Sequence, residues 1–242
     1  MNTPNKTEKL LTITQAAQFL NVSVNTLRRW DANGKLIAIR KERGTHRYYS
    51  KKDLEIFSSD LLKLANDWTV SGSQIEARFY CQNSSVFLAR LSKLQDLLIK
   101  KSNKIFSLIV AISGEIGSNS YDHNLGNWPD VPGIFFGYDV DKSVVVLADR
   151  GLGILETLKR VRPNLNNHLE ALHVAFTEMV SGRAPEKRGN GLKFVREVIS
   201  QNPINLFFKS GDAELRMEGK NPSLNMTRSA VVIRGCLAFI KF

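Results

Sequence analysis

The sequence predicts a mixed α/β (α+β) protein with a small N-terminal winged helix-turn-helix domain and a larger C-terminal domain of helices and strands. Near the N-terminus, two short amphipathic helices are separated by a three-residue turn, which is typical of a helix-turn-helix. Much later, an apolar helical run at 105–112 precedes an apolar strand at 143–148 that ends in a carboxylate and two glycines. This alternation of helical and strand patterns indicates helices packed on a sheet.

Composition limits the classes of protein to consider. The chain has 242 residues and a net charge of +11, which suits two domains and favours a polyanionic partner. Cys81 and Cys236 are its only cysteines, so a disulfide framework and a zinc cluster are excluded. The polar stretch 1–9 is no signal peptide, and the longest apolar run is too short to cross a membrane. We therefore expect a cytoplasmic protein.

The first two helices have a buried and an exposed side. Thr14 is a good N-cap for the first helix, which ends near Leu20. The second helix spans 24–30, with Leu27 and Trp30 facing inward. Its other residues face outward, as a helix that reads the major groove requires; they are Asn25, Thr26, Arg28 and Arg29.

A wing is expected after these helices. Asn33-Gly34 is a hairpin signal, 36–39 reads as a strand, and 40–47 is a basic turn around Gly44. Tyr48-Tyr49 would return as the second strand of the wing.

The block 11–60 resembles the MerR/excisionase winged DNA-binding domain, through LRRW at 27–30 and GTHRYY at 44–49. The resemblance implies double-stranded DNA as partner, with Arg28 and Asn25 at base edges and Arg43 and Arg47 at phosphates. The residues expected on the wing side of the DNA are Arg43, His46, Arg47 and Tyr48. The block is also similar to the N-terminal module of some serine transposases. The alternative is a small protein-binding module with a solvated basic turn.

A middle segment separates the two domains. We expect the first domain at 1–65, closed by a helix over 51–65, then a linker at 66–73 and a helical region up to 103. That region has an apolar stripe at helical spacing: Phe87, Leu88, Leu91, Leu94, Leu97 and Leu98. The stripe is either ordinary core or the surface of a homodimer. The region contains no histidine, which argues against a self-phosphorylating histidine kinase.

A row of polar residues follows the apolar run 105–112. Residues four apart on a helix differ by only about 40° around its axis, so Glu115, Asn119 and His123 line one face. A carboxylate can accept a proton from water, and an amide oxygen suits Mg²⁺. This face is therefore expected to border a cavity.

Two glycine-containing segments follow. The strand at 143–148 leads into Asp149-Arg-Gly151-Leu-Gly153-Ile154, where glycines let the backbone approach a ligand. Arg188-Gly189-Asn-Gly191-Leu192 opens a helical pattern, whose free N–H groups can hold phosphate. Strands are also expected at 133–138, 204–209, 213–217 and 230–242, and helices at 155–162 and 167–180.

Residues 104–242 resemble the GHKL ATPase family, which includes gyrase B, MutL, histidine kinases and anti-sigma-factor kinases. The resemblance is carried by Glu115-x3-Asn119-x3-His123, Asp149-x-Gly151-x-Gly153 and Gly189-x-Gly191. It implies ATP in a Bergerat-type sandwich, with helices on one face of a mixed sheet, and a lid at 181–188. It implies Mg²⁺ on Asn119, Glu115 polarising water or the acceptor, and Asp149 accepting from the adenine amino group. The other residues expected at the cofactor are His123, Gly151, Gly153, Ile154, Arg188, Gly189, Gly191 and Leu192. Where the family often has Gly-Thr, this chain has Gly235-Cys236, and a thiol donates poorly.

Three functions fit these observations. The first is a DNA-binding regulator whose occupancy or assembly responds to ATP. The second is a serine/threonine kinase of the anti-sigma-factor type, acting on a separate partner protein. The third is a mobile-element accessory protein that uses ATP only structurally. Whether the protein is an enzyme, as an ATPase or a kinase, stays open at this point.

Overall fold

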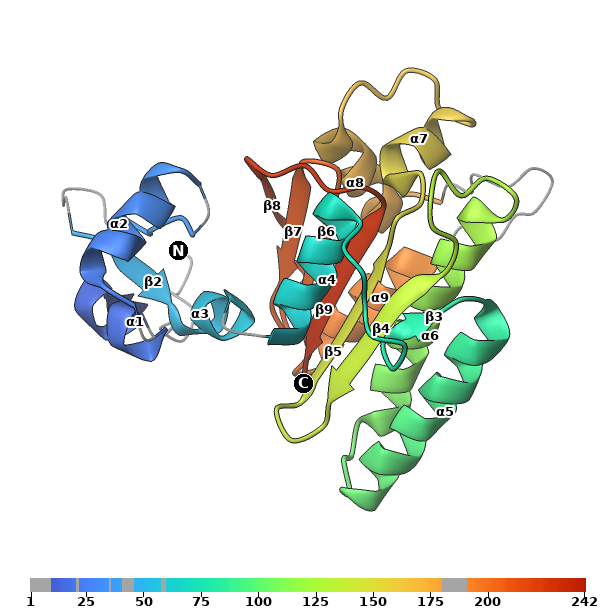
Figure 1. The fold of residues 1–242 in the computed structure, drawn as a ribbon, viewed down its shortest axis with the longest axis horizontal. Coiled ribbons are helices and arrows are strands. Elements are labelled where there is room, and N and C mark those ends of the chain that lie inside the picture. Colours follow the sequence, from blue (N-terminus) through green and yellow to red (C-terminus); the bar gives the residue numbers. More distant parts are fainter. Residues whose placement is uncertain (1–9, 21, 35, 41–45, 58–59, 180–190) are drawn as a thin grey trace. The chain divides into compact units, whose positions relative to one another are not determined.

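The structure, a computed structural model, describes residues 10–20, 22–34, 36–40, 46–57, 60–179 and 191–242. The chain divides into two compact units, Met1–Lys63 and Leu64–Phe242 (Figure 1). Helices and two short strands form the first unit, and the second contains a seven-stranded sheet with helices. The predicted mixed α/β fold with an N-terminal helix-turn-helix is confirmed.

The first unit packs three helices against a two-stranded antiparallel ribbon. Its elements are β1 (Leu10–Thr12), α1 (Ile13–Phe19), α2 (Val24–Ala32), β2 (Tyr48–Ser50) and α3 (Lys51–Phe57). Alanine, leucine and tyrosine side chains fill its core, namely Ala16, Ala17, Leu27, Leu36, Ala38, Tyr49 and Leu54.

Side-chain caps determine where the first two helices begin. The N-cap of α1 is Thr12, not Thr14: its hydroxyl accepts from the Gln15 N–H, and the Gln15 side chain accepts from the Thr12 N–H. This reciprocal capping box satisfies two backbone donors at once and outweighs a single cap at Thr14. Ser23 caps α2 by accepting from the Thr26 N–H at 3.1 Å.

The wing differs from the prediction in two ways. Asn33 is the C-cap of α2, and Gly34 follows it with a φ of 72°, so this pair ends a helix and does not turn a hairpin. The strand predicted at 36–39 is reduced to one bridge between Ile39 and Tyr48. Along its length β2 pairs instead with β1, which the sequence did not predict, and Tyr48 uses its other edge for the bridge to Ile39.

The second unit is built on a sheet in the order β3-β4-β5-β9-β6-β7-β8. Its strands are β3 (Tyr80–Cys81), β4 (Ile134–Asp139), β5 (Val144–Asp149), β6 (Asn205–Ser210), β7 (Ala213–Met217), β8 (Asn225–Arg228) and β9 (Cys236–Lys241). Every pairing among these strands is antiparallel, so the expected mixed sheet is wrong. The chain returns with β9 between β5 and β6, in the direction opposite to both.

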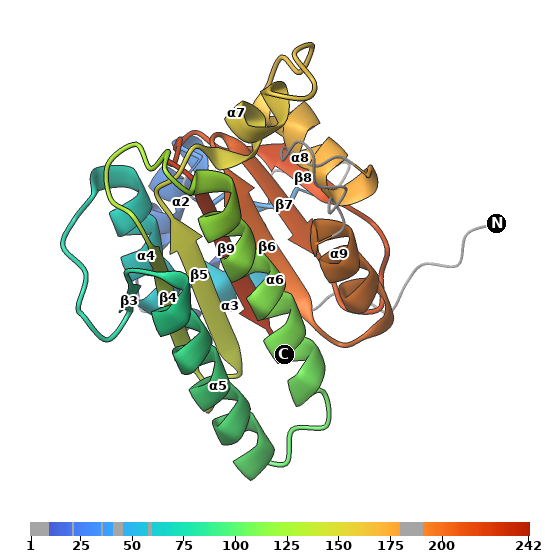
Figure 2. The same ribbon diagram turned by 90° about the vertical axis from the view of Figure 1, so that its right-hand side faces the viewer.

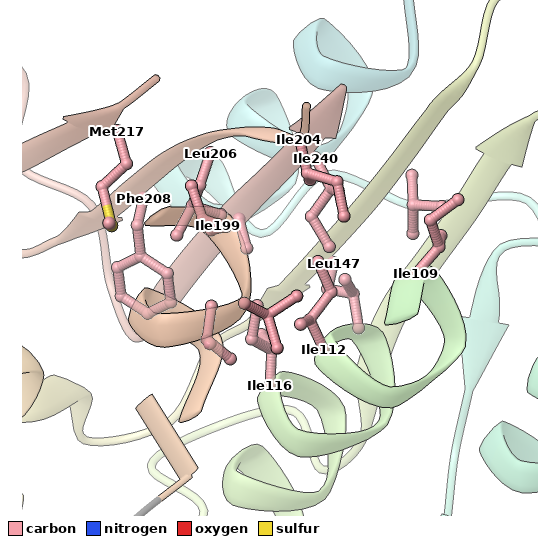
Figure 3. Close-up of a cluster of buried hydrophobic side chains, with 14 of the residues drawn as sticks. Ile109, Ile112, Ile116, Leu147, Ile199, Ile204, Leu206, Phe208, Met217 and Ile240 are labelled. Atoms are coloured by element: carbon pink, nitrogen blue, oxygen red, sulfur yellow. The ribbon is translucent and has the colours of Figure 1, made fainter. Parts of the chain in front are cut away.

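Helices cover one face of this sheet (Figure 2). They include α5 (Ser84–Lys100), α6 (Phe106–Asn124), α8 (His168–Thr177) and α9 (Gly191–Gln201), while α7 (Gly153–Lys159) follows β5. Figure 3 shows Ile112 and Ile116 of α6 packed toward Leu147 of β5 and Ile199 of α9. Because this main core packs α6 against the sheet, it also fixes the direction in which the polar residues on the other sides of α6 point.

The segment before α5 is more ordered than predicted. Helix α4 (Asp60–Ser71) occupies most of the expected linker at 66–73, and its Ala65 and Trp68 are buried. The prediction of a linker there is wrong, because polar residues that look like a linker are here the C-terminal half of a docked helix. Figure 1 shows α4 beside β9 and β6, on the face opposite to α5 and α6. The bulky side chains on that face, such as Val146 and Phe239, are also buried.

The apolar stripe of α5 is core. Phe87, Leu91, Leu94 and Leu98 belong to the main core cluster, whereas Leu88 is 54% exposed. α6 and the sheet cover these four side chains, so they are not part of a homodimer surface, while Leu88 and Leu97 stay exposed and the homodimer itself stays a prediction. Among the described residues, none of the helices is both long and apolar enough to cross a membrane.

Candidate functional site

The outward side of α2 carries the residues expected to reach DNA bases. Asn25, Arg28 and Arg29 are exposed, and Thr26 is partly buried. Leu27 on the opposite side is fully buried, so the helix cannot rotate away from this orientation. Arg28 Nη1 donates to Asn25 Oδ1 at 3.2 Å, which aligns the two side chains along the helix. A polar donor and acceptor set of this kind can contact base edges.

One acidic residue links α2 to the wing. Asp31 accepts from Arg40 Nη2 at 2.5 Å, from Arg47 Nε at 2.6 Å and from the Ala38 N–H at 2.9 Å. Burial raises the pKa of the Asp31 carboxyl, but the hydrogen bonds from Ala38, Arg47 and Arg40 outweigh it and lower this pKa below its ordinary value. Asp31 is therefore an anion at neutral pH that holds two wing arginines against the end of α2.

The residues expected on the wing differ in how exposed they are to solvent. His46 is exposed, Tyr48 is half-buried at the start of β2, and Arg43 lies outside the described residues. Arg47, expected at phosphate, has its Nε on Asp31 while about a third of its side chain stays exposed. Sequence reasoning missed Asp31, although it is the one acidic residue in α2 and directly follows the LRRW motif.

In the second unit, α6 presents its polar row toward the start of α9. A Cβ built on Gly191 would lie 2.7 Å from Glu115 Oε2 and 3.1 Å from Asn119 Nδ2. Glu115 is exposed and Asn119 is half-buried. The structure thus brings Glu115 and Asn119 next to a glycine that lies more than 70 positions later in the sequence. The first N–H groups of a helix have no partner within the helix and carry a partial positive charge, so the start of α9 is the kind of position that can receive an anion.

His123 lies one turn further along the same row. Burial and the nearby charge of Arg160 lower the pKa of His123, so its imidazole is neutral at pH 7. Arg188 and Gly189, and the expected lid at 181–188, lie outside the described residues. Leu192, in the first turn of α9, packs against the main core.

Asp149 is a buried carboxylate at the end of β5. Its Oδ2 accepts from Ser120 Oγ at 2.8 Å, and its Oδ1 accepts from the Gly151 N–H at 2.8 Å. Burial raises the pKa of Asp149, and hydrogen bonds from Ser120, Gly151 and the Cys236 N–H oppose that rise. Three donors thus share a carboxylate that has roughly four lone-pair positions and that is almost completely buried.

The glycine turn after Asp149 is held by an amide from α6. Asn124 Oδ1 accepts from the Leu152 N–H, and Asn124 Nδ2 donates to the Ser120 carbonyl. A Cβ on Gly151 would overlap this amide, so only glycine fits there. Gly153 has a φ of 76°, which favours glycine. Both glycines of this turn therefore have a physical reason to be glycine.

A serine on β6 completes the turn. Ser210 Oγ accepts from the Ile154 N–H at 3.0 Å and donates to the Gly235 carbonyl at 3.1 Å. Cys236 Sγ lies 3.6 Å from the same hydroxyl, so the thiol points into this network. At the position where the resemblance anticipates a threonine, the hydroxyl in this structure belongs to the neighbouring strand.

Sequence reasoning selected one side of α6 and missed the other. It identified Glu115 and Asn119, which face α9, but not Ser120 and Asn124, which hold the Asp149 turn. The missed pair is also spaced by four residues, in the same EIGSNSYDHN stretch. That spacing was the available signal, but only the packed helix shows that two of its sides are used.

Two comparisons with known proteins were informative, and the first concerns the N-terminal unit. Residues 10–57 match a family described as a helix-turn-helix domain. Over 64 residues, 26% of this chain, it is 33% identical to the type II methyltransferase M.Eco47II of Escherichia coli. The matched part spans 15% of that relative's length. The N-terminal unit is thus a helix-turn-helix domain, which supports DNA as a partner.

Proposed function

We propose that this protein is a DNA-binding regulator in which an adenine nucleotide, bound with Mg²⁺ by the second unit, modulates a MerR-like winged helix-turn-helix in the first. The DNA half rests on the exposed face of α2 and on the helix-turn-helix match. The nucleotide half rests on one observation, the meeting of Glu115 and Asn119 with Gly191 at the start of α9.

The junction of α6 and α9 suits the phosphates. The N–H groups at the start of a helix are an anion site, and the missing side chain of Gly191 leaves its backbone open to Glu115 and Asn119. Among the described residues, no cluster of three or more acidic, histidine or cysteine side chains could cage a metal. Mg²⁺ does not need such a cluster, because it usually takes one or two protein oxygens and completes its shell with water and phosphate. Asn119 would supply an oxygen, and Mg²⁺ would neutralise phosphate charge.

The Asp149 turn suits the base. Its carboxylate is fixed by Ser120 and the Gly151 N–H, and a carboxylate has roughly four lone-pair positions. An exocyclic amino group can donate there, and the glycine turn lets a flat ring approach the backbone. Because the turn and the phosphate junction are both held by α6, the two ends of one nucleotide would bind to a single rigid helix.

A second candidate function is favoured by the position of Glu115. Its carboxylate is exposed, so a hydroxyl from another protein could reach it as readily as water. A serine/threonine kinase acting on a separate partner protein therefore stays a proposal, with Glu115 as the base. The third candidate, a mobile-element accessory protein, would bind the nucleotide without turnover.

Calorimetry and DNA titration test the main proposal with the full chain. ATP with Mg²⁺ should bind with a dissociation constant in the micromolar to millimolar range, about 1 μM to 1 mM. Arg28→Ala should weaken binding to specific DNA by about 1–3 kcal/mol, whereas Lys100→Ala on α5, a matched loss of one exposed charge, should not. Labelled γ-phosphate ATP, with and without cell extract, then separates regulator from kinase. If calorimetry detects no ATP binding, the proposed nucleotide site is wrong. If the full chain binds DNA no more tightly than a basic control protein does, the proposed DNA-binding function is wrong.

A further inference from the structure

Helix α4 ends against the side chain of the residue between Asp149 and Gly151. Arg150 Nη1 donates to the carbonyls of Trp68 at 2.7 Å and Thr69 at 2.9 Å. These carbonyls belong to the last turn of α4; the Trp68 carbonyl also accepts from the Gly72 N–H, whereas the last carbonyls of a helix in general lack an intrahelical donor. A guanidinium at this position also faces the negative end of the helix dipole. Arg150 is therefore the C-terminal cap of α4.

This cap is buried and charge-balanced. The Arg150 side chain is only 8% exposed, and its Nη2 pairs with Asp130 Oδ2 at 2.5 Å. Arg234 reaches the same carboxylate at 2.9 Å, and its backbone N–H donates to the Thr69 carbonyl. Burial raises the pKa of the Asp130 carboxyl, but Arg150, the Val131 N–H and Arg234 outweigh it and lower this pKa below its ordinary value. A buried guanidinium with fixed partners on both sides has little freedom to adjust.

The geometry around Gly72 confirms how tightly the cap is fitted. Gly72 ends the helix with a φ of 68°, and its N–H donates to the Trp68 carbonyl. A Cβ on Gly72 would lie 3.3 Å from Arg150 Cζ, so the guanidinium fills the space beside this glycine.

The backbone of Arg150 belongs to the glycine turn. Before Arg150, the Asp149 carboxylate accepts hydrogen bonds from Ser120 and from the Gly151 N–H. After Arg150, the Leu152 N–H donates to Asn124. The backbone of this turn would therefore meet the base, while the Arg150 side chain holds α4. A displacement of the turn moves the guanidinium and with it the last turn of α4.

The other end of α4 leads out of the second unit. The helix is continuous from Asp60 to Ser71, and the chain divides into its two units between Lys63 and Leu64, within this helix. A continuous helix transmits a shift or a loosening at one end along its axis better than a flexible linker does.

We propose that Arg150 is a positioning residue that couples the glycine turn to α4, so that occupation of the turn changes how firmly α4 is held and thereby modulates the helix-turn-helix unit. This inference rests on the proposed nucleotide site and specifies the route by which that site acts. The ligand is an adenine nucleotide in contact with the glycine turn, and its binding changes how strongly Arg150 stabilises the last turn of α4.

The test uses the full chain, Arg150→Lys, Asp130→Asn and, as a matched control, Arg162→Lys, whose guanidinium pairs with Glu178. Lysine keeps the charge but cannot reproduce the fork of hydrogen bonds to two carbonyls and a carboxylate. Three quantities are measured with and without ATP and Mg²⁺: nucleotide affinity by calorimetry, hydrogen exchange of residues 61–73, and affinity for a specific DNA fragment.

In the parent and in Arg162→Lys, nucleotide should change the exchange of 61–73 and shift DNA affinity by about 5- to 150-fold. In Arg150→Lys and Asp130→Asn, exchange of 61–73 should be faster in both states, and the nucleotide-dependent shift should fall below about 2-fold. If ATP binds but exchange of 61–73 does not respond in the parent, or the variants keep the full shift, the coupling is refuted while the nucleotide site stands. If calorimetry detects no ATP binding, the proposed site and this inference both fail.

Discussion

Replacing Asp149 by asparagine tests the candidate base site most directly. Asparagine has the same shape but loses one acceptor and the charge, and gains an NH₂ donor. The amide oxygen can still accept from the backbone N–H groups of Gly151 and Cys236, and the Ser120 hydroxyl can turn to accept from the new NH₂. The structure therefore accommodates Asp149→Asn without a cavity or a clash.

The expected magnitudes follow from these contacts. A hydrogen bond to a charged group contributes about 1.5–3 kcal/mol, so losing the acceptor for the base should weaken ATP binding about 10- to 150-fold. The free energy of unfolding should change by less than about 1.5 kcal/mol at neutral pH, because the burial cost of the charge disappears together with the stronger hydrogen bonds.

The pH dependence has a definite sign. Burial raises the pKa of Asp149 above its ordinary value of 3.8. A carboxyl with a raised folded-state pKa stabilises the fold below the unfolded value, and this contribution is lost as pH rises through the folded pKa. The unfolding free energy of Asp149→Asn minus that of the parent should therefore increase as pH rises from about 3.8.

Calorimetry with ATP and urea unfolding between pH 4 and 8 measure both effects, and Asp96→Asn on the exposed side of α5 is the control. Equal ATP affinity of Asp149→Asn and the parent would remove Asp149 from the base site. A stability difference that does not vary with pH would show that the carboxyl is not buried as described.

Three further variants test other parts of the structure. Glu115→Ala should keep ATP binding and abolish any turnover, because the carboxylate is needed only when a nucleophile is activated; parental turnover of this variant would exclude that role. Gly117→Ala should lower the unfolding free energy by about 1–3 kcal/mol in urea titrations, because its Cβ would overlap the Phe87 ring; an unchanged or higher value, from the better helix propensity of alanine, would show that α5 shifts freely. Asp31→Asn should weaken protection of α2 from hydrogen exchange by about 1.5–3 kcal/mol at pH 7. Because the Asp31 pKa is lowered, this difference should vanish as pH falls through the folded-state pKa below 3.8, and a difference that persists there would contradict the ion pair with Arg47.

The features that sequence reasoning predicted well are local. Leu27 faces the core while Arg28 faces outward because a helix turns about 100° per residue, and the spacing of Glu115 and Asn119 places them side by side for the same reason. The two glycines after Asp149 could be recognised as a turn because glycine lets the backbone adopt conformations and close approaches that other residues do not. None of these inferences needed a distant part of the chain.

The features that it missed depend on contacts between distant segments. Polar residues at 66–73 look like a linker until Arg150, 82 positions away from Trp68, caps them as the end of a helix. Leucines at helical spacing are equally consistent with a core and with a dimer surface, and only the packing of α6 assigns them to the core. An antiparallel sheet likewise follows from the return of β9 between β5 and β6.

By itself, then, the sequence determined a helix-turn-helix unit, a polar row on a helix and an acidic glycine turn, since each is specified by side chains within one or two helical turns. Only the tertiary structure decided that Asp31 holds the wing, that Ser120 and Asn124 fix the Asp149 carboxylate and its turn, and that Arg150 joins that turn to α4. The physical reason is that a buried polar group must find its hydrogen-bond partner wherever the fold brings one, and spacing along the chain does not specify that partner.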